Sequence, residues 1–291
     1  MIATVPLPYP FGFPFMQRAL VAGVVVGIFA PLIGTFLVQK RMSLIGDGIG
    51  HIAFAGVGAG LWVAVLTGSS LRVWPIWTAL VFAVVGALGI EWLRARRKAS
   101  GDLALALFFY SGIALGVVLV SRANGLNANI LTYLFGQPLA ASDSDVRTIV
   151  ARGAFITVVV VAFRRALFAV VTDEDWSRVA GLPVGALNSL LAVLTACAVV
   201  AAMKIVGILL IAAMMVLPVA SGQLLARSFA GTLRWSMAIG VASVIGGLTL
   251  SWIWNLAPSG AIVLLTAAIF AVVAVVTRGV ARLNVTEEVE A

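Results

Sequence analysis

The chain has 291 residues, of which 62% are hydrophobic and only 10% are charged, and its formal net charge is +8. Soluble domains carry about 25% charged residues, so this composition excludes an ordinary soluble protein and indicates a membrane protein. The basic residues form short clusters between apolar runs, which fits membrane topology and anionic headgroups and speaks against nucleic acid as a partner.

The first fifteen residues contain no Lys or Arg and are interrupted by prolines. A cleavable signal peptide needs a basic start and an unbroken apolar core, so residues 1–15 are interpreted as an extracytoplasmic N-terminal segment. Cys197 is the only cysteine, which excludes an intrachain disulfide and a Cys-based metal cluster.

Uncharged runs long enough to cross a bilayer follow one another along the chain, since a spanning helix needs about 20 mostly apolar residues. The run 123–142 is uncharged but rich in Asn and Gln, so a loop or partly inserted segment is expected there. The fold class is therefore all-α, a polytopic transmembrane helical bundle of nine spans, or eight if 184–203 and 205–226 form one bent helix. The predicted spans are 19–39, 48–71, 73–90, 103–121, 148–171, 184–203, 205–226 and two within 235–277, separated at Asn255–Gly260.

The positive charges predict the orientation. With the N-terminus outside and nine alternating helices, thirteen Lys and Arg residues fall on the cytoplasmic side and six on the other, as the positive-inside rule requires. Residues 16–278 would form the transmembrane domain, with the 172–183 loop and the acidic tail 279–291 in the cytoplasm of a cell whose inner membrane holds the chain.

Small residues recur four apart in several predicted spans. Such pairs let two helix backbones approach closely, because lipid supplies no hydrophobic drive between helices. We interpret them as packing positions: Gly23 with Gly27, Gly46 with Gly50, Gly56 with Gly60, and Gly112 with Gly116.

Asp47 and His51 are the first candidate site. His51 is the only histidine of the chain, and residues 48–71 carry no other charged group. Positions i and i+4 of a helix lie about 40° apart in azimuth and roughly 6 Å apart along the axis, so both side chains leave one face. A buried charge in a membrane is costly and usually functional. The alternatives are that the two residues only pair with each other, or that Asp47 lies at the interface after Lys40 and Arg41.

Carboxylate oxygen and imidazole nitrogen are ligands that suit Zn²⁺ and Mn²⁺. Two ligands are too few for a tight zinc site, which normally has four. Other polar groups, or a second copy of Asp47 and His51 across a two-fold axis, would have to complete it. A transport site must also release its ion.

The segment 172–183 is the second candidate. Asp173, Glu174 and Asp175 suit the positive N-terminus of a short helix that Gly181 would end; composition alone favours an ordinary solvated loop. Lys204 and Arg152 are interpreted as helix ends. No lysine follows a glycine, so the chain lacks a phosphate-binding loop, and no catalytic constellation stands out. An enzyme is not expected.

Four segments resemble the integral-membrane permeases of zinc and manganese ABC importers, and among them the zinc uptake permeases. The likeness extends from about Met16 to about Arg278. The segments are 40–51 (Lys-Arg-Met-Ser leading to Gly-Asp and His51), 132–140 (Thr-Tyr-Leu-Phe-Gly to Leu-Ala), 202–220 (Ala-Met-Lys-Ile-Val-Gly to Pro218 and Ala220) and 258–260 (Pro-Ser-Gly). Ser259 departs from the more usual alanine, and a histidine-rich segment is absent.

The resemblance implies a homodimer bound to two copies of a cytoplasmic ATPase, which binds the ATP, and an extracytoplasmic receptor that delivers the ion. It places Asp47 and His51 on the translocation path and makes the 172–183 segment the contact with the ATPase. The residues expected to make that contact are Asp173, Glu174, Asp175, Trp176, Arg178, Ala180 and Gly181.

We therefore expect a permease that imports Zn²⁺, or alternatively Mn²⁺ or Fe²⁺, by alternating access, with no cofactor of its own. Three other functions stay open. A permease for a metal chelate would not need the acid and the histidine, a proton-coupled secondary transporter would need no ATPase, and a purely structural membrane subunit would need neither residue.

Overall fold

The computed structural model describes residues 11–68, 74–96, 101–123 and 128–290. Every regular element in these ranges is helical, as the composition predicted. The elements are α1 (Pro14–Gln39), α2 (Ile45–Thr67), α3 (Trp74–Ala95), α4 (Gly101–Arg122), α5 (Ala128–Phe135), η1 (Pro138–Ala140), α6 (Asp143–Thr172), α7 (Glu174–Val179), α8 (Val184–Met203), α9 (Ile208–Leu225), α10 (Phe229–Trp254) and α11 (Pro258–Glu290).

Within the described ranges, nine helices are long and apolar enough to cross a membrane, which confirms the nine-span prediction. The single bent helix considered for 184–226 does not form. Gly207 has a φ of +87°, and the turn that it makes separates α8 from α9. The chain is a multi-pass membrane protein.

The part of the polar run 123–142 that the structure describes contains no helix long enough to cross a membrane. It forms the short helix α5 and the single 3-10 turn η1, in keeping with the expectation that this run is not a full span. Gly136 follows α5 with a φ of +73°, and a Cβ atom at that position would collide with the backbone of Val206 and Gly207. The glycines thus let the end of α5 lie directly on the turn between α8 and α9.

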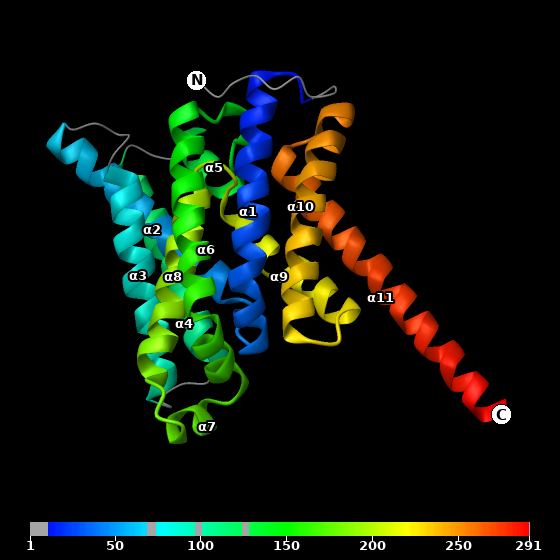
Figure 1. Cartoon of the computed structure of the whole chain (residues 1–291). Helices are drawn as coiled ribbons and strands as arrows, with labels where there is room; N and C mark the ends of the chain where they lie inside the picture. The colour runs from blue at the N-terminus through cyan, green and yellow to red at the C-terminus, as the bar shows by residue number, and fades with distance from the viewer. Residues whose placement is uncertain (1–10, 69–73, 97–100, 124–127, 291) are drawn as a thin grey trace.

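The helices form two groups, and most of them run along the long direction of the bundle (Figure 1). α2 packs between α3 and α4, while α1 packs against α6, α9 and α10, and α8 contacts α2, α3 and α6 between the two groups. α11 contacts only α9 and α10 among the stronger helix pairs and leans away from the bundle. α7 lies at the end of the bundle opposite the start of α1 (Figure 1).

The paired glycines lie at these helix contacts. A Cβ atom on Gly27 would lie 3.1 Å from the backbone of Gly240 in α10, and one on Gly56 would lie 2.6 Å from Cα of Ala79 in α3. Neither helix pair has room for a side chain there. The predicted packing role is confirmed at these positions.

The turn between α1 and α2 is short and fixed by backbone hydrogen bonds. The N–H of Arg41 donates to the carbonyl of Val38 (3.0 Å), and that of Met42 donates to the carbonyl of Leu37 (2.9 Å). Arg41 takes a positive φ of 59° to close this C-terminal cap, a position that usually holds glycine. The cap delivers the chain into α2 four residues later.

The structure describes only part of the two segments that were predicted to flank the membrane domain. Residues 1–10, with Pro6, Pro8 and Pro10, lie outside the described ranges, and α1 begins at Pro14. α11 continues as one helix through Glu290, past the boundary expected at 278. The division into 1–15, 16–278 and 279–291 stays a prediction.

Candidate functional site

Asp47 and His51 lie in the first two turns of α2 and face each other. The distance from His51 Nε2 to Asp47 Oδ1 is 3.6 Å, and the side chains are 20% and 32% exposed respectively. Asp47 is in the first turn of the helix, where the helix dipole stabilises a carboxylate. The structure therefore brings together the two residues that the i, i+4 spacing predicted, and leaves both accessible to a small guest.

Helix α4 shapes the surroundings of the pair. The ring of Phe109 meets the His51 imidazole edge-on, with centroids 4.5 Å apart. One turn further along α4, a Cβ atom on Gly112 would lie 3.1 Å from the carbonyl carbon of His51. The absence of a side chain at Gly112 lets α4 approach α2 at this point, and the approach holds the Phe109 ring against the imidazole.

A cavity of about 300 Å³ opens beside the carboxylate between α2 and α4. Asp47 borders it together with Phe109 and Tyr110 of α4. In the part of the chain that the structure describes, no group of three or more His, Cys, Asp or Glu side chains could hold a metal ion. Asp47 and His51 thus supply two donor groups beside a cavity, fewer than the four ligands of a usual zinc site.

The predicted short helix in the 172–183 segment is α7. The Asp173 side chain caps it by accepting a hydrogen bond from the Trp176 N–H (2.9 Å), and Ala180 and Gly181 end it, with Gly181 at a φ of +80°. Its expected contact residues do not share one face. Trp176 is 63% exposed, whereas Glu174 turns inward toward α3 and α8.

The inward glutamate joins a set of four charges, Lys40, Glu91, Arg94 and Glu174, called here the ion-pair cluster. The Arg94 guanidinium donates to Glu91 (2.8 Å) and to Glu174 (2.6 Å), and Lys40 Nζ lies 3.5 Å from Glu91 Oε2. Sequence analysis missed Glu91. The signal was available, because Glu91 is a lone acid that directly follows an uncharged membrane run, where a charge needs a partner.

The cluster shifts the pKa values of its members that lie outside the spanning helices. Burial lowers the pKa of the Lys40 ammonium to about 8, and Arg94 opposes protonation there, although Glu91 and Glu174 favour the charged form. For Glu174, burial alone would raise the pKa of the carboxyl group; the hydrogen bond and charge of Arg94, with the charge of Lys40, outweigh it and lower the pKa.

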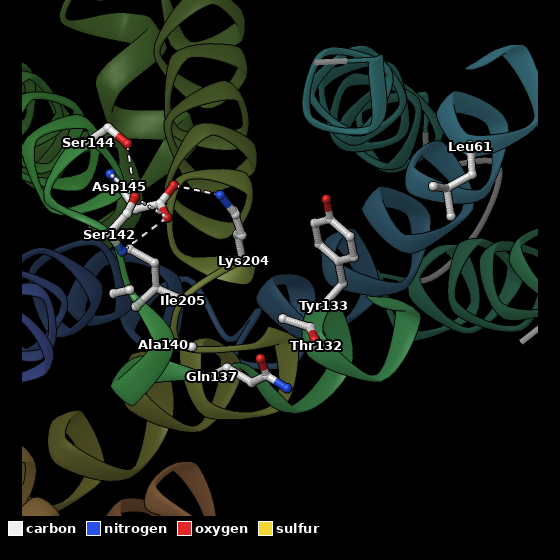
Figure 2. A pocket seen from close by; sticks show the side chains of 11 residues that line it. Leu61, Thr132, Tyr133, Gln137, Ala140, Ser142, Ser144, Asp145, Lys204 and Ile205 are labelled. Carbon is white, nitrogen blue, oxygen red and sulfur yellow. Dashed lines mark hydrogen bonds and ion pairs between the residues drawn. The ribbon is translucent and has the colours of Figure 1, made fainter. Parts of the chain in front are cut away.

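A second cavity, of about 740 Å³, lies elsewhere, between α2, α5, α6 and the end of α8. Figure 2 shows Lys204 pointing at Asp145 on one side of it, with Tyr133 between this pair and Leu61. Lys204 Nζ donates to Asp145 Oδ1 at 2.6 Å. Lys204 does cap the end of α8, as predicted, and it also lines this cavity. Neither Asp47 nor His51 borders it.

Membrane-spanning helices that carry an acid and a histidine beside a cavity are typical of membrane transport proteins. The family model for the ABC 3 transport family matches residues 12–278. The chain belongs to this family, and it is therefore a membrane component of an ABC transporter.

Three relatives illustrate the likeness. The chain is 31% identical over 259 residues to the manganese transport system membrane protein MntC of Halalkalibacterium halodurans, covering 89% of this chain and 86% of that one. It is 27% identical over 258 residues to the high-affinity zinc uptake system membrane protein ZnuB of Haemophilus influenzae, covering 89% and 96%. The solved structure of PsaBC from Streptococcus pneumoniae, in complex with Fab, matches with a TM-score of 0.77 and 31% identity over 90% of this chain and 91% of that one.

Proposed function

We propose that the chain is the permease subunit of an ABC importer for divalent transition-metal ions, and that Asp47 and His51 bind the ion transiently as it passes. The observation that carries the proposal is the pair itself. A carboxylate and the only imidazole of the chain stand 3.6 Å apart on a membrane-spanning helix, and the carboxylate opens on a cavity.

The donor chemistry supports a borderline metal ion. One carboxylate oxygen and one imidazole nitrogen suit Mn²⁺ and Zn²⁺, whereas thiolate or thioether ligands would favour Cu(I). A pair that lacks further ligands binds weakly enough to release its ion, which transport requires. The names of the manganese and zinc relatives support the same class of cargo.

Two ions are candidates for the cargo. The sequence motifs predicted zinc, whereas the manganese relative has the higher identity, 31% against 27%. The donor set serves both ions. A competition experiment separates them: uptake of each ion is measured while the other is added at increasing free concentration. The physiological cargo should inhibit uptake of the other ion at the lower concentration.

The proposed assembly has two permease copies, a cytoplasmic ATPase and an extracytoplasmic receptor. Family membership supports an ATP-driven partner, and the permease itself is the non-catalytic subunit. A second copy would supply a second Asp47 and His51, which brings the donor number to the four of a usual zinc site. Uptake that requires ATP would exclude the proton-coupled transporter that the sequence left open.

The test measures metal uptake by cells that lack their own importer and express Asp47→Ala or His51→Ala at matched membrane levels. Uptake should fall about tenfold or more, because losing a ligand removes a metal bond outright. Asp143→Ala is the matched control. This carboxylate is 44% exposed and pairs only loosely with Arg18, at 3.7 Å, so its loss should leave uptake unchanged. Normal uptake by both site variants rejects the proposal.

A further inference from the structure

The ion-pair cluster joins three separate parts of the chain. Lys40 follows the end of α1, Glu91 and Arg94 belong to the last turns of α3, and Glu174 begins α7. Besides the Arg94 bonds, Lys40 Nζ lies 3.7 Å from Glu174 Oε1, and Asn188 of α8 donates to the same oxygen at 3.1 Å. One carboxylate of α7 therefore contacts side chains from three other elements.

The cluster is largely buried. The side chains of Lys40 and Glu91 are 6% and 8% exposed, and those of Arg94 and Glu174 are 22% and 27% exposed. Arg178 of α7, whose side chain is 57% exposed, lies 3.6 Å from the second oxygen of Glu174 and connects the cluster to the surface. Each buried charge has an opposite partner, which is the condition under which buried charges are tolerated. A buried ion pair is weak evidence for stability, since apolar residues of similar size often stabilise as well or better. What distinguishes a buried ion pair is that it holds its side chains in one fixed geometry.

The opposite face of α7 is open. Val179 is 88% exposed and Trp176 is 63% exposed, and the Asp175 side chain is 83% exposed beside Arg178. Large exposed apolar side chains beside charged ones are typical of protein interfaces. α7 thus has an outer face of Asp175, Trp176 and Val179, and an inner anchor at Glu174.

The inner anchor leads directly to the candidate metal site. Lys40 precedes the hydrogen-bonded cap at Arg41 and Met42, and α2 begins at Ile45 with Asp47 in its first turn. Only seven positions separate Lys40 from Asp47. A displacement of Glu174 would act on Lys40, and through this tight cap on the start of α2.

We propose that the ion-pair cluster is the joint that transmits movement of α7 to Asp47, with Glu174 and Lys40 as positioning residues and Trp176 and Val179 as the surface that meets the partner. This proposal rests on the proposed function, in which an ATPase moves α7. The partner it requires is a protein with a groove that accepts an apolar side chain and basic groups opposite Asp175.

The experiment uses the complete transporter, with its ATPase, in proteoliposomes, and measures metal uptake and ATP hydrolysis on the same sample. Glu174→Gln should keep the ATPase bound and hydrolysing, while uptake per ATP falls about tenfold, within the range of coupling free energies between sites. Trp176→Ala should instead release the ATPase during purification, so that hydrolysis and uptake fall together.

Two further variants keep the test decisive if Glu174→Gln folds poorly. Asn188→Ala removes one hydrogen bond, from a neutral amide donor to the Glu174 carboxylate, and should lower uptake per ATP about two- to threefold, because the Arg94 bonds remain. Lys40→Arg keeps the charge and should retain wild-type coupling. Asp143→Asn makes the same carboxylate-to-amide change in an exposed pair at the other end of the bundle and should have no effect.

Two results overturn the proposal. Wild-type uptake per ATP in Glu174→Gln and Asn188→Ala shows that the cluster transmits nothing, and loss of the ATPase from Glu174→Gln shows that Glu174 belongs to the docking surface. Asp47→Ala in the same vesicles separates this failure from that of the proposed function. If Asp47→Ala abolishes uptake while Glu174→Gln is normal, the metal site stands and only the joint fails.

Discussion

Two groups of charged or ionisable side chains are connected by the turn between α1 and α2, and they differ in how far their charges are paired. Within the ion-pair cluster each charge has at least one opposite partner, and the cluster is mostly buried. Asp47 and His51, which follow Lys40 at the start of α2, pair with each other beside a cavity. Charges that are satisfied internally fix a geometry, whereas charges left partly unsatisfied can accept a guest. The two groups should therefore respond to substitution in opposite ways.

The largest expected difference between the two groups comes from replacing a carboxylate by an amide of nearly the same shape. Asp47→Asn should reduce metal uptake about tenfold or more without lowering the thermal midpoint, because the residue is partly solvated and anchors no other helix. Glu91→Gln should instead destabilise the fold by about 3 kcal/mol, since it leaves buried Lys40 and Arg94 short of a counter-charge. Uptake assays and thermal unfolding in detergent measure both. Equal loss of stability in the two variants would erase the distinction.

Gly112→Ala tests the surroundings of the Asp47–His51 pair without changing either residue. Its added Cβ would lie 3.0–3.2 Å from the backbone of His51 and Ile52, so α4 must move by a few tenths of an ångström and carry Phe109 away from the imidazole. We expect a several-fold loss of uptake, because small displacements of a binding group are costly. Gly101→Ala is the control, since nothing lies within 4 Å of a Cβ atom there.

Alkaline pH should affect the ion-pair cluster through Lys40. With a pKa of about 8 in the folded protein against 10.5 ordinarily, Lys40 is neutral when folded and charged when unfolded between these values. The folded state then binds fewer protons, so Lys40 makes the free energy of unfolding rise with pH in this window. Over the same pH range, the neutral Lys40 side chain loses its attraction to Glu91 and Glu174 and also its repulsion from Arg94.

Coupling and stability should thus change in opposite directions as pH rises through about 8. Uptake per ATP in the wild type should fall relative to Lys40→Arg, which stays charged. The measurement is the ratio of the two proteins at each pH, so that effects on the ATPase cancel. A ratio that stays constant would show that the charge of Lys40 is not needed for coupling.

The smallest effect is expected at Asp145 and Lys204. Their bond is short, 2.6 Å, but the Lys204 side chain is 43% exposed to solvent and the Asp145 side chain 22% exposed, and pairs with a solvated partner contribute about 1 kcal/mol or less. Lys204→Ala should barely change the thermal midpoint, and added salt should remove the difference. A loss as large as that of Glu91→Gln would show that exposure does not separate structural from dispensable pairs in this protein.

Much of this could be predicted from sequence because the signals were local. Uncharged runs fixed the number of spans, the i, i+4 spacing brought Asp47 to His51, and acids before Gly181 predicted α7. The ion-pair cluster could not be found in this way. Lys40, Glu91 and Glu174 are far apart in the chain, and only the packing of α1, α3 and α7 brings them together. The assignment of all of α7 to one contact surface failed to anticipate its inner face for the same reason.

Gly136 and Gly207 touch through their backbones, each at a positive φ, where α5 meets the turn after α8. An overlarge residue in a packed core is often rescued by a smaller one opposite. Here the residue opposite is already glycine, the smallest residue. A larger side chain at one glycine therefore cannot be compensated by a smaller residue at the other. In genetic terms the two positions are a single irreplaceable contact, and suppressors of a defect at one should be sought anywhere except at its neighbour.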